Sequence, residues 1–151
     1  MRLNRYGNYV VRGQARESDG PSEINLYNGT YLHGFRLVDI KCAGKSPTAN
    51  NQSMIVASTL STNVTLSADR WKWQDQHEVG WASSAKEGQS SRDNLFSLVD
   101  SSIIVVDKLY IYAHATEGTD YGVNYYVELE PVSIDGYEYT LSYLQNGRHN
   151  E

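Results

Sequence analysis

The chain has 151 residues, of which 40% are hydrophobic and 21% charged, a composition typical of one folded domain rather than a disordered or membrane-embedded chain. A formal net charge of -5 argues against nonspecific binding to nucleic acid, and the single cysteine, Cys42, excludes an internal disulfide framework and a Cys-rich zinc site. The polar N-terminal residues lack the apolar segment of a secretory signal, and no apolar run approaches the roughly 20 residues of a spanning helix. We therefore expect a chain with no membrane association.

Tyrosine dominates the aromatic residues, with 12 Tyr against 2 Phe, which favours pleated, half-buried surfaces and hence β-sheet. Residues 1–22 are expected to be an N-terminal arm or a first strand, because Arg12 to Ser22 is polar and contains glycine. Residues 23–147 are expected to form a single β-sandwich domain.

The first predicted strand pair flanks Asn28-Gly29. Strands from Ile24 to Tyr27 and from Thr30 to Cys42 surround this dipeptide, which tolerates the two positive φ angles of a type I′ turn. The sequence therefore predicts a β-hairpin, with Cys42 as a small buried hydrophobe on its second strand.

Short strands and a loop follow. Apolar and aromatic runs predict strands at Met54–Leu60, Val64–Leu66, Arg70–Trp73 and Glu78–Ala82. The polar stretch Lys86–Asn94 predicts a surface loop. After it, the spacing of Leu95, Leu98 and Val99 is compatible with one amphipathic helical turn.

The clearest alternation lies in two later segments. Apolar residues occupy every second position from Leu109 to Ala115 and from Val123 to Leu129. Because residues 116–122 between them are rich in turn formers, a second, longer hairpin is predicted here.

Near the C-terminus, Tyr137, Leu141 and Leu144 have helical spacing, and Asn146-Gly147 follows as a stop signal. This predicts a helix from about 137 to 145. The expected fold class is therefore an all-β, antiparallel β-sandwich, jelly-roll-like, with one short C-terminal helix.

Candidate catalytic groups are few. Glu128 and Glu130 share one face of a predicted strand at about 7 Å, a separation compatible with an inverting glycosidase, but alternating strands normally display such carboxylates to solvent. His77-Glu78 begins a zinc-protease pattern, but Trp81 stands where the second histidine is required. We therefore expect no enzyme, no catalytic residue, no metal site and no cofactor, with a small hydrolase as the least favoured alternative.

Aromatic residues are the candidates for binding. Three tryptophans with acidic neighbours suggest either a sugar-binding platform or, as the favoured interpretation, packing in the core or in a subunit contact. The candidate interface or glycan-binding residues are Trp71, Trp73, Trp81, Tyr110, Tyr112 and Tyr126.

Two segments resemble a sequence pattern of small virion proteins of marine tailed bacteriophages. They are Trp71 to Ala82, and Leu109 to His114 followed by Val123 to Glu130, so the similarity covers about the last half of the chain. The resemblance implies a β-sandwich component attached to the capsid as a decoration or auxiliary protein, assembled in the host cytoplasm. It supplies no catalytic residues.

On this basis we expect a noncatalytic virion structural protein, a homo-oligomer that contacts the major capsid protein or other virion proteins. Such proteins act through symmetric interfaces with aromatic anchors. The N-terminal segment either lies along an acidic capsid neighbour or forms a solvated tail; its basic residues are Arg2, Arg5, Arg12 and Arg16. The alternative function is a carbohydrate-binding adhesion module of a phage tail or fibre, which requires Trp71, Trp73 and Trp81 to be exposed and coplanar.

Overall fold

The structure is a computed structural model that describes residues 1–26, 33–46, 50–61, 71–86 and 93–133. The regular elements in these ranges are strands and one short 3-10 turn, Glu17–Asp19. The strands are β1 (Arg2–Leu3), β2 (Tyr9–Ala15), β3 (Ser22–Asn25), β4 (His33–Gly44), β5 (Asn51–Ser58), β6 (Glu78–Lys86), β7 (Asp93–Val99), β8 (Ile104–Val105), β9 (Lys108–Ala115) and β10 (Val123–Ser133).

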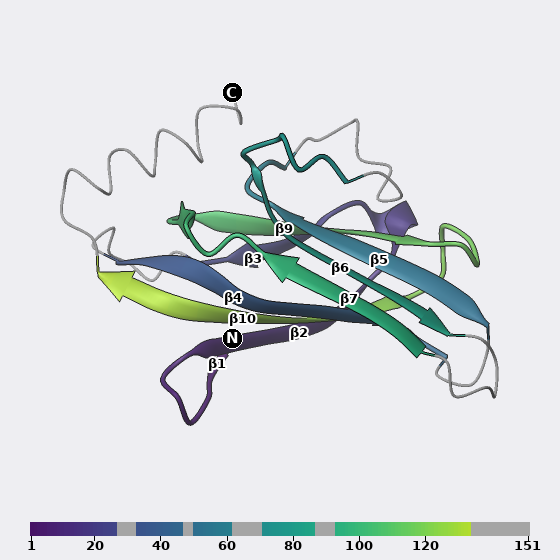
Figure 1. Cartoon of the computed structure of the whole chain (residues 1–151), viewed down its shortest axis with the longest axis horizontal. Helices are drawn as coiled ribbons and strands as arrows, with labels where there is room; N and C mark the ends of the chain where they lie inside the picture. The colour runs from purple at the N-terminus through teal and green to yellow at the C-terminus, as the bar shows by residue number, and fades with distance from the viewer. Residues whose placement is uncertain (27–32, 47–49, 62–70, 87–92, 134–151) are drawn as a thin grey trace.

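The strands form two antiparallel sheets. The first sheet has the strand order β1-β2-β10-β4-β8, and the second has the order β3-β9-β5-β6-β7. The sheets lie one against the other, with β2, β4 and β10 in one layer and β5, β6 and β9 in the other (Figure 1). The predicted all-β antiparallel sandwich is therefore confirmed.

The core lies between the two sheets and follows from the alternation of apolar residues. Ile40 and Val127 from the first sheet and Ile55 and Ile111 from the second are all fully buried. Burying a side chain of this size contributes about 1.5–3 kcal/mol relative to leaving it in water. The inward faces of β4, β5, β9 and β10 thus hold the sheets together.

Gly80 allows β6 to approach the first sheet closely. A Cβ atom at this position would overlap Cδ2 of Leu37 and lie 3.3 Å from Cδ1 of Ile40. A larger residue would push the two sheets apart at this point.

The two predicted hairpins are wrong, although their strands are present. β9 pairs with β3 and β5, whereas β10 pairs with β2 and β4, so residues 116–122 connect the two sheets. In the same way β3 pairs with β9, and β4 pairs with β10 and β8 in the other sheet. In a β-sandwich, two consecutive strands can lie in different sheets, joined by a connection from one sheet to the other, or they can pair with each other as a hairpin.

Two further local predictions are corrected. Leu95, Leu98 and Val99 belong to strand β7 and not to a helical turn, because β7 pairs along its length with β6. Trp71 and Trp73 lie in a turn-rich segment before β6 and not in a strand. The hydrogen bonds of this segment are local, such as that from the Asp75 amide to the Lys72 carbonyl.

The N-terminal residues form β1 and β2, and β2 pairs along its whole length with β10. Three predictions fall on other parts of the chain. The helix at 137–145, the strand at 64–66 and the turn at Asn28-Gly29 lie outside the described residues.

Candidate functional site

The three tryptophans gather at the N-terminal end of β6 but do not share a plane. Trp81 is 5% exposed, whereas Trp73 is 58% exposed. Their ring centroids are 6.0 Å apart, with an angle of 60° between the ring planes. Trp71 instead stacks on Phe96 of β7 at 5.5 Å and 28°.

These positions do not form the flat sugar platform that was the less favoured interpretation of the three tryptophans. A flat platform needs several indole faces open to solvent in one plane, but Trp81 is buried and meets Trp73 edge to face. Trp71 already has Phe96 against its ring. The cluster packs this segment against β6 and β7 and leaves Trp73 as its exposed member.

A buried carboxyl group holds the cluster together. Glu78 is 1% exposed, and its Oε1 accepts hydrogen bonds from Nε1 of Trp81 at 2.8 Å and from the amide of Lys72 at 3.0 Å. Its Oε2 has no hydrogen-bond partner in the part of the chain that the structure describes. Burial raises the pKa of Glu78 above 4.5, against the opposing effect of the two hydrogen bonds.

The candidate tyrosines separate into buried and surface positions. Tyr110 is buried, and the hydroxyl of Tyr112 donates a 2.7 Å hydrogen bond to the carbonyl of Leu60. Tyr126 lies on the outer face of β10, where its hydroxyl donates to Oε1 of Glu128 at 3.3 Å. Partial desolvation, and then the Glu128 carboxylate, raise the pKa of Tyr126. Of the three, Tyr126 faces an open surface.

Of the two glutamates considered as a catalytic pair, Glu128 and Glu130, the first is held by hydrogen bonds from neighbouring side chains. Both oxygens of Glu128 accept amide hydrogen bonds, from Nδ2 of Asn4 at 3.2 Å and from Nδ2 of Asn8 at 3.0 Å. These contacts fasten the β1–β2 turn to β10. Glu130 is exposed on the same strand.

An exposed apolar edge was not predicted from the sequence. β7 is the last strand of the second sheet and carries Leu95, Phe96 and Leu98, which are 75%, 42% and 41% exposed. The spacing of Leu95 and Leu98 suggests a helical turn, and the residues do not alternate with the period of 2 that indicates a strand. The signal in the sequence is the unbroken pair Leu95-Phe96 next to a polar stretch.

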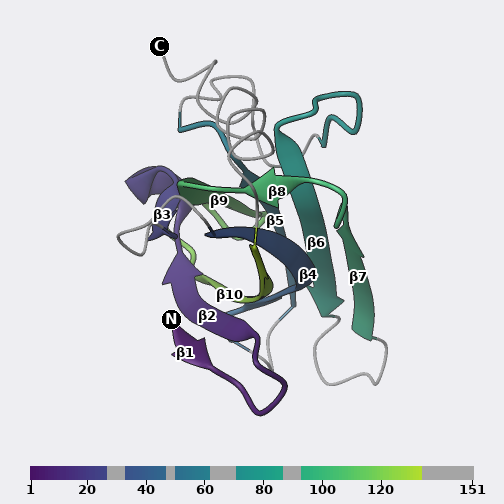
Figure 2. The ribbon, with the colours of Figure 1, turned by 90° about the vertical axis from the view of Figure 1, so that its left-hand side faces the viewer.

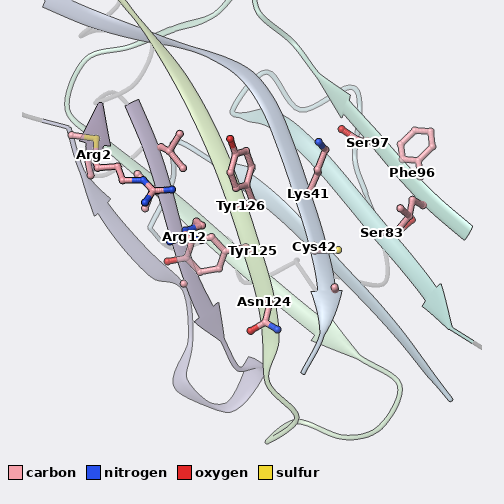
Figure 3. Close-up of a pocket in the computed structure, with 16 residues that line it drawn as sticks. Arg2, Arg12, Lys41, Cys42, Ser83, Phe96, Ser97, Asn124, Tyr125 and Tyr126 are labelled. Atoms are coloured by element: carbon pink, nitrogen blue, oxygen red, sulfur yellow. The ribbon is translucent and has the colours of Figure 1, made fainter. Parts of the chain in front are cut away.

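A groove of about 940 Å³ runs across the strands of the first sheet and ends at β7. Its lining comes from β1, β2, β10, β4, β6 and β7 (Figure 3). In the middle, Arg12, Tyr126 and Lys41 form one cross-strand row, with Arg12 and Lys41 on either side of the tyrosine. Nζ of Lys41 lies 5.9 Å from the Tyr126 ring centroid and 3.2 Å from Oδ2 of Asp39.

None of the carboxylates in the described ranges lines this groove, although the chain as a whole is acidic. Arg2 joins Arg12 and Lys41 as the third cation, and neither arginine forms an ion pair with any described residue. Leu95 and Phe96 supply an apolar end at β7. The groove therefore combines local positive charge with apolar surface.

Within the described ranges, no group of three or more His, Cys, Asp or Glu side chains is arranged to hold a metal ion. In the same ranges there is no helix with the length and apolar character needed to cross a bilayer. Comparisons with protein-family models, curated proteins and solved structures give no significant match to this chain. The fold, the apolar edge of β7 and the groove are therefore the features of this chain that bear on its function.

Proposed function

We propose that this chain is a noncatalytic structural protein that acts by docking, as a head decoration, cement or auxiliary protein of a virus particle. The observation that carries the docking role is the apolar edge of β7, formed by Leu95, Phe96 and Leu98. Its partners are further copies of the chain and other virion proteins, with the major capsid protein as the main one.

The edge supports docking because an exposed apolar edge strand is normally avoided. Natural proteins protect such edges with charged residues, proline or a covering segment, since unpaired backbone groups there invite another strand. No second described strand pairs with β7 on the side away from β6. The large exposed apolar residues on this strand resemble the central anchors of protein interfaces.

The noncatalytic part of the proposal draws support from how the acidic groups are used. Glu78 is enclosed between Trp81 and the Lys72 amide, and Glu128 is bound by Asn4 and Asn8. Both carboxyls thus have roles in holding segments together. The virion setting rests on the resemblance of Trp71 to Ala82, of Leu109 to His114 and of Val123 to Glu130 to a sequence pattern of phage particle proteins.

The virion role is tested on virus particles purified from the source of this gene. Quantitative mass spectrometry and cryo-electron imaging should find the chain at a copy number that matches a symmetric position on the head. Absence from the particles, or a trace amount without symmetry, would contradict the virion proposal.

The docking role is tested on the purified chain by sedimentation velocity over a range of concentrations. We expect concentration-dependent self-association that Leu98→Lys and Leu95→Lys each weaken, because a charged residue protects an edge strand. Asn94→Lys is the matched control, since it adds the same charge at an exposed polar position of β7. Equal effects of all three substitutions would exclude the apolar edge as the contact.

A further inference from the structure

We propose that the groove across the first sheet binds an extended acidic peptide segment of a partner protein, with its carboxylates on Lys41 and Arg12 and an apolar residue at Leu95 and Phe96. This inference deepens the proposed docking function and rests on it, because it names the chemistry of one partner. Three features of the groove support it: its charge, its direction across the strands and its apolar end.

Charge complementarity identifies the acidic character of the ligand. Arg2, Arg12 and Lys41 reach the groove, and none of the described carboxylates lines it. Asp39 and Glu128 lie beside the row but are engaged, since Asp39 pairs with Lys41 and Glu128 accepts from Asn4 and Asn8. An acidic ligand would therefore meet Arg2 and Arg12 without an ion pair to any described residue, and it would share Lys41 with Asp39.

The groove runs across the strands, so the distance between Arg12 and Lys41 sets the distance between the two carboxylates of the ligand. Arg12 and Lys41 are each cross-strand partners of Tyr126, so they lie two strand spacings apart, or about 10 Å. A polyproline II segment rises about 3.1 Å per residue with three residues per turn, so residues i and i+3 share one face about 9 Å apart. Two acidic residues three positions apart match the two cations, with the Tyr126 ring between them.

The Tyr126 ring and the apolar end favour a peptide over an acidic sugar. Aromatic-lined grooves are the usual receptors for polyproline II segments, because the segment is already extended and loses little entropy. Leu95 and Phe96 would contact an apolar side chain, which a hydroxyl-covered sugar does not supply. A volume of about 940 Å³ is at the upper end of small-molecule pockets, as expected for a peptide of several residues.

The test is a binding measurement by fluorescence anisotropy on the full chain. The probe is a fluorescein-labelled peptide of about eight residues, with two glutamates three positions apart, proline between them and leucine at one end. Two comparison peptides replace both glutamates by glutamine or place them at adjacent positions. We expect saturable binding of the probe and weaker binding of both comparison peptides, with an affinity that falls as salt rises.

The matched variants are Arg12→Gln/Lys41→Gln in the groove and Arg5→Gln/Lys45→Gln outside it. Both remove two exposed positive charges, but Arg5 and Lys45 do not line the groove. Loss of two surface ion pairs should weaken probe binding about tenfold in the groove variant and little in the control. Circular dichroism of both variants establishes that they are folded.

Three outcomes would overturn the inference. They are no saturable binding of the probe, equal binding of the glutamine peptide, and equal weakening by the two double variants. An acidic oligosaccharide such as oligogalacturonate that binds more tightly than the probe would also replace the peptide as the ligand. None of these results would affect the docking proposal, which particle copy number and self-association test separately.

Discussion

Trp81 and Glu78 lie on the same face of β6 and are joined by the 2.8 Å hydrogen bond from Nε1 to Oε1. They are three residues apart, so regular alternation would place them on opposite faces of the strand. The pairing of β5 with β6 shifts here, from Ala57 with Gly80 to Ser58 with Glu78, and leaves Val79 as an extra residue. This β-bulge turns the side chains of Glu78 and Trp81 toward residues 71–77, the segment before β6, and makes the buried hydrogen bond possible.

Trp81→Phe should destabilise the protein by about 1–3 kcal/mol, because it keeps an aromatic ring but removes the indole donor to a buried carboxyl group. Urea denaturation measures the free energy of unfolding. Trp73→Phe is the control, since Trp73 is largely exposed. Equal losses in the two variants would show that the hydrogen bond does not stabilise the bulge.

Glu78→Gln should change how stability depends on pH. Burial raises the folded-state pKa of Glu78 above 4.5, so the folded chain holds this proton more tightly than the unfolded chain. The contribution of Glu78 to the free energy of unfolding is therefore greatest below the unfolded pKa and falls as pH rises through the folded pKa. At pH values above the folded-state pKa, Glu78 is ionised in both states, and its contribution to the free energy of unfolding is constant and unfavourable.

The measurement is urea denaturation of the wild type and of Glu78→Gln between about pH 4 and pH 8. The stability of the variant relative to the wild type should increase with pH and then level off. Glu130→Gln is the control, since it makes the same change at an exposed position of β10. A relative stability of Glu78→Gln that decreases with pH would contradict the raised pKa.

The Cys42 thiol should be almost unreactive in the folded chain. Burial raises its pKa from 9.0 to about 12, against smaller opposing effects of hydrogen bonding. At pH 8 about one thiol in 10⁴ is then ionised, against about one in ten at a pKa of 9.0. Reaction with a disulfide reagent should be about a thousandfold faster in denaturing urea. A native rate close to the rate in urea would show that the thiol is accessible.

Gly80→Ala should cost about 1–3 kcal/mol, because the new methyl group would overlap Leu37 and press on Ile40. Leu37→Ala alone should cost about 2–5 kcal/mol by opening a cavity. In the double variant the two changes compensate in volume, so its cost should be less than the sum of the single costs. If the costs of the two single variants, measured by urea denaturation, simply add in the double variant, then the methyl group at position 80 does not clash with Leu37.

The strands themselves were largely predictable, but their partners were not. Alternation from Leu109 to Ala115 and from Val123 to Leu129 reports one buried face, and both segments are strands. Alternation does not show which strands a segment pairs with. A hairpin and a connection between the two sheets therefore have the same pattern in the sequence. β7 was missed because residues 94–98 are exposed on both faces, so its apolar residues do not alternate with period 2, and the spacing of Leu95, Leu98 and Val99 suggested a helical turn instead.

The candidate surfaces depended on long-range geometry. Tyr126 was identified as a candidate from its strand, but its neighbours Arg12 and Lys41 are brought beside it by pairing across the sheet. The tryptophan platform was wrong because the turn before β6 and the bulge at Val79 set the ring planes. Neither feature leaves a recognisable spacing in the sequence.

The place of β10 in the first sheet also constrains how the chain is made. β10 lies between β2 and β4, yet it is the last of the described strands to be synthesised (Figure 2). Until Val123–Ser133 leaves the ribosome, β2 and β4 have no strand to join them, so the first sheet cannot form as one layer. Folding of the sandwich is therefore delayed until late in translation, and a nascent chain that stops before β10 is a substrate for chaperones and proteases.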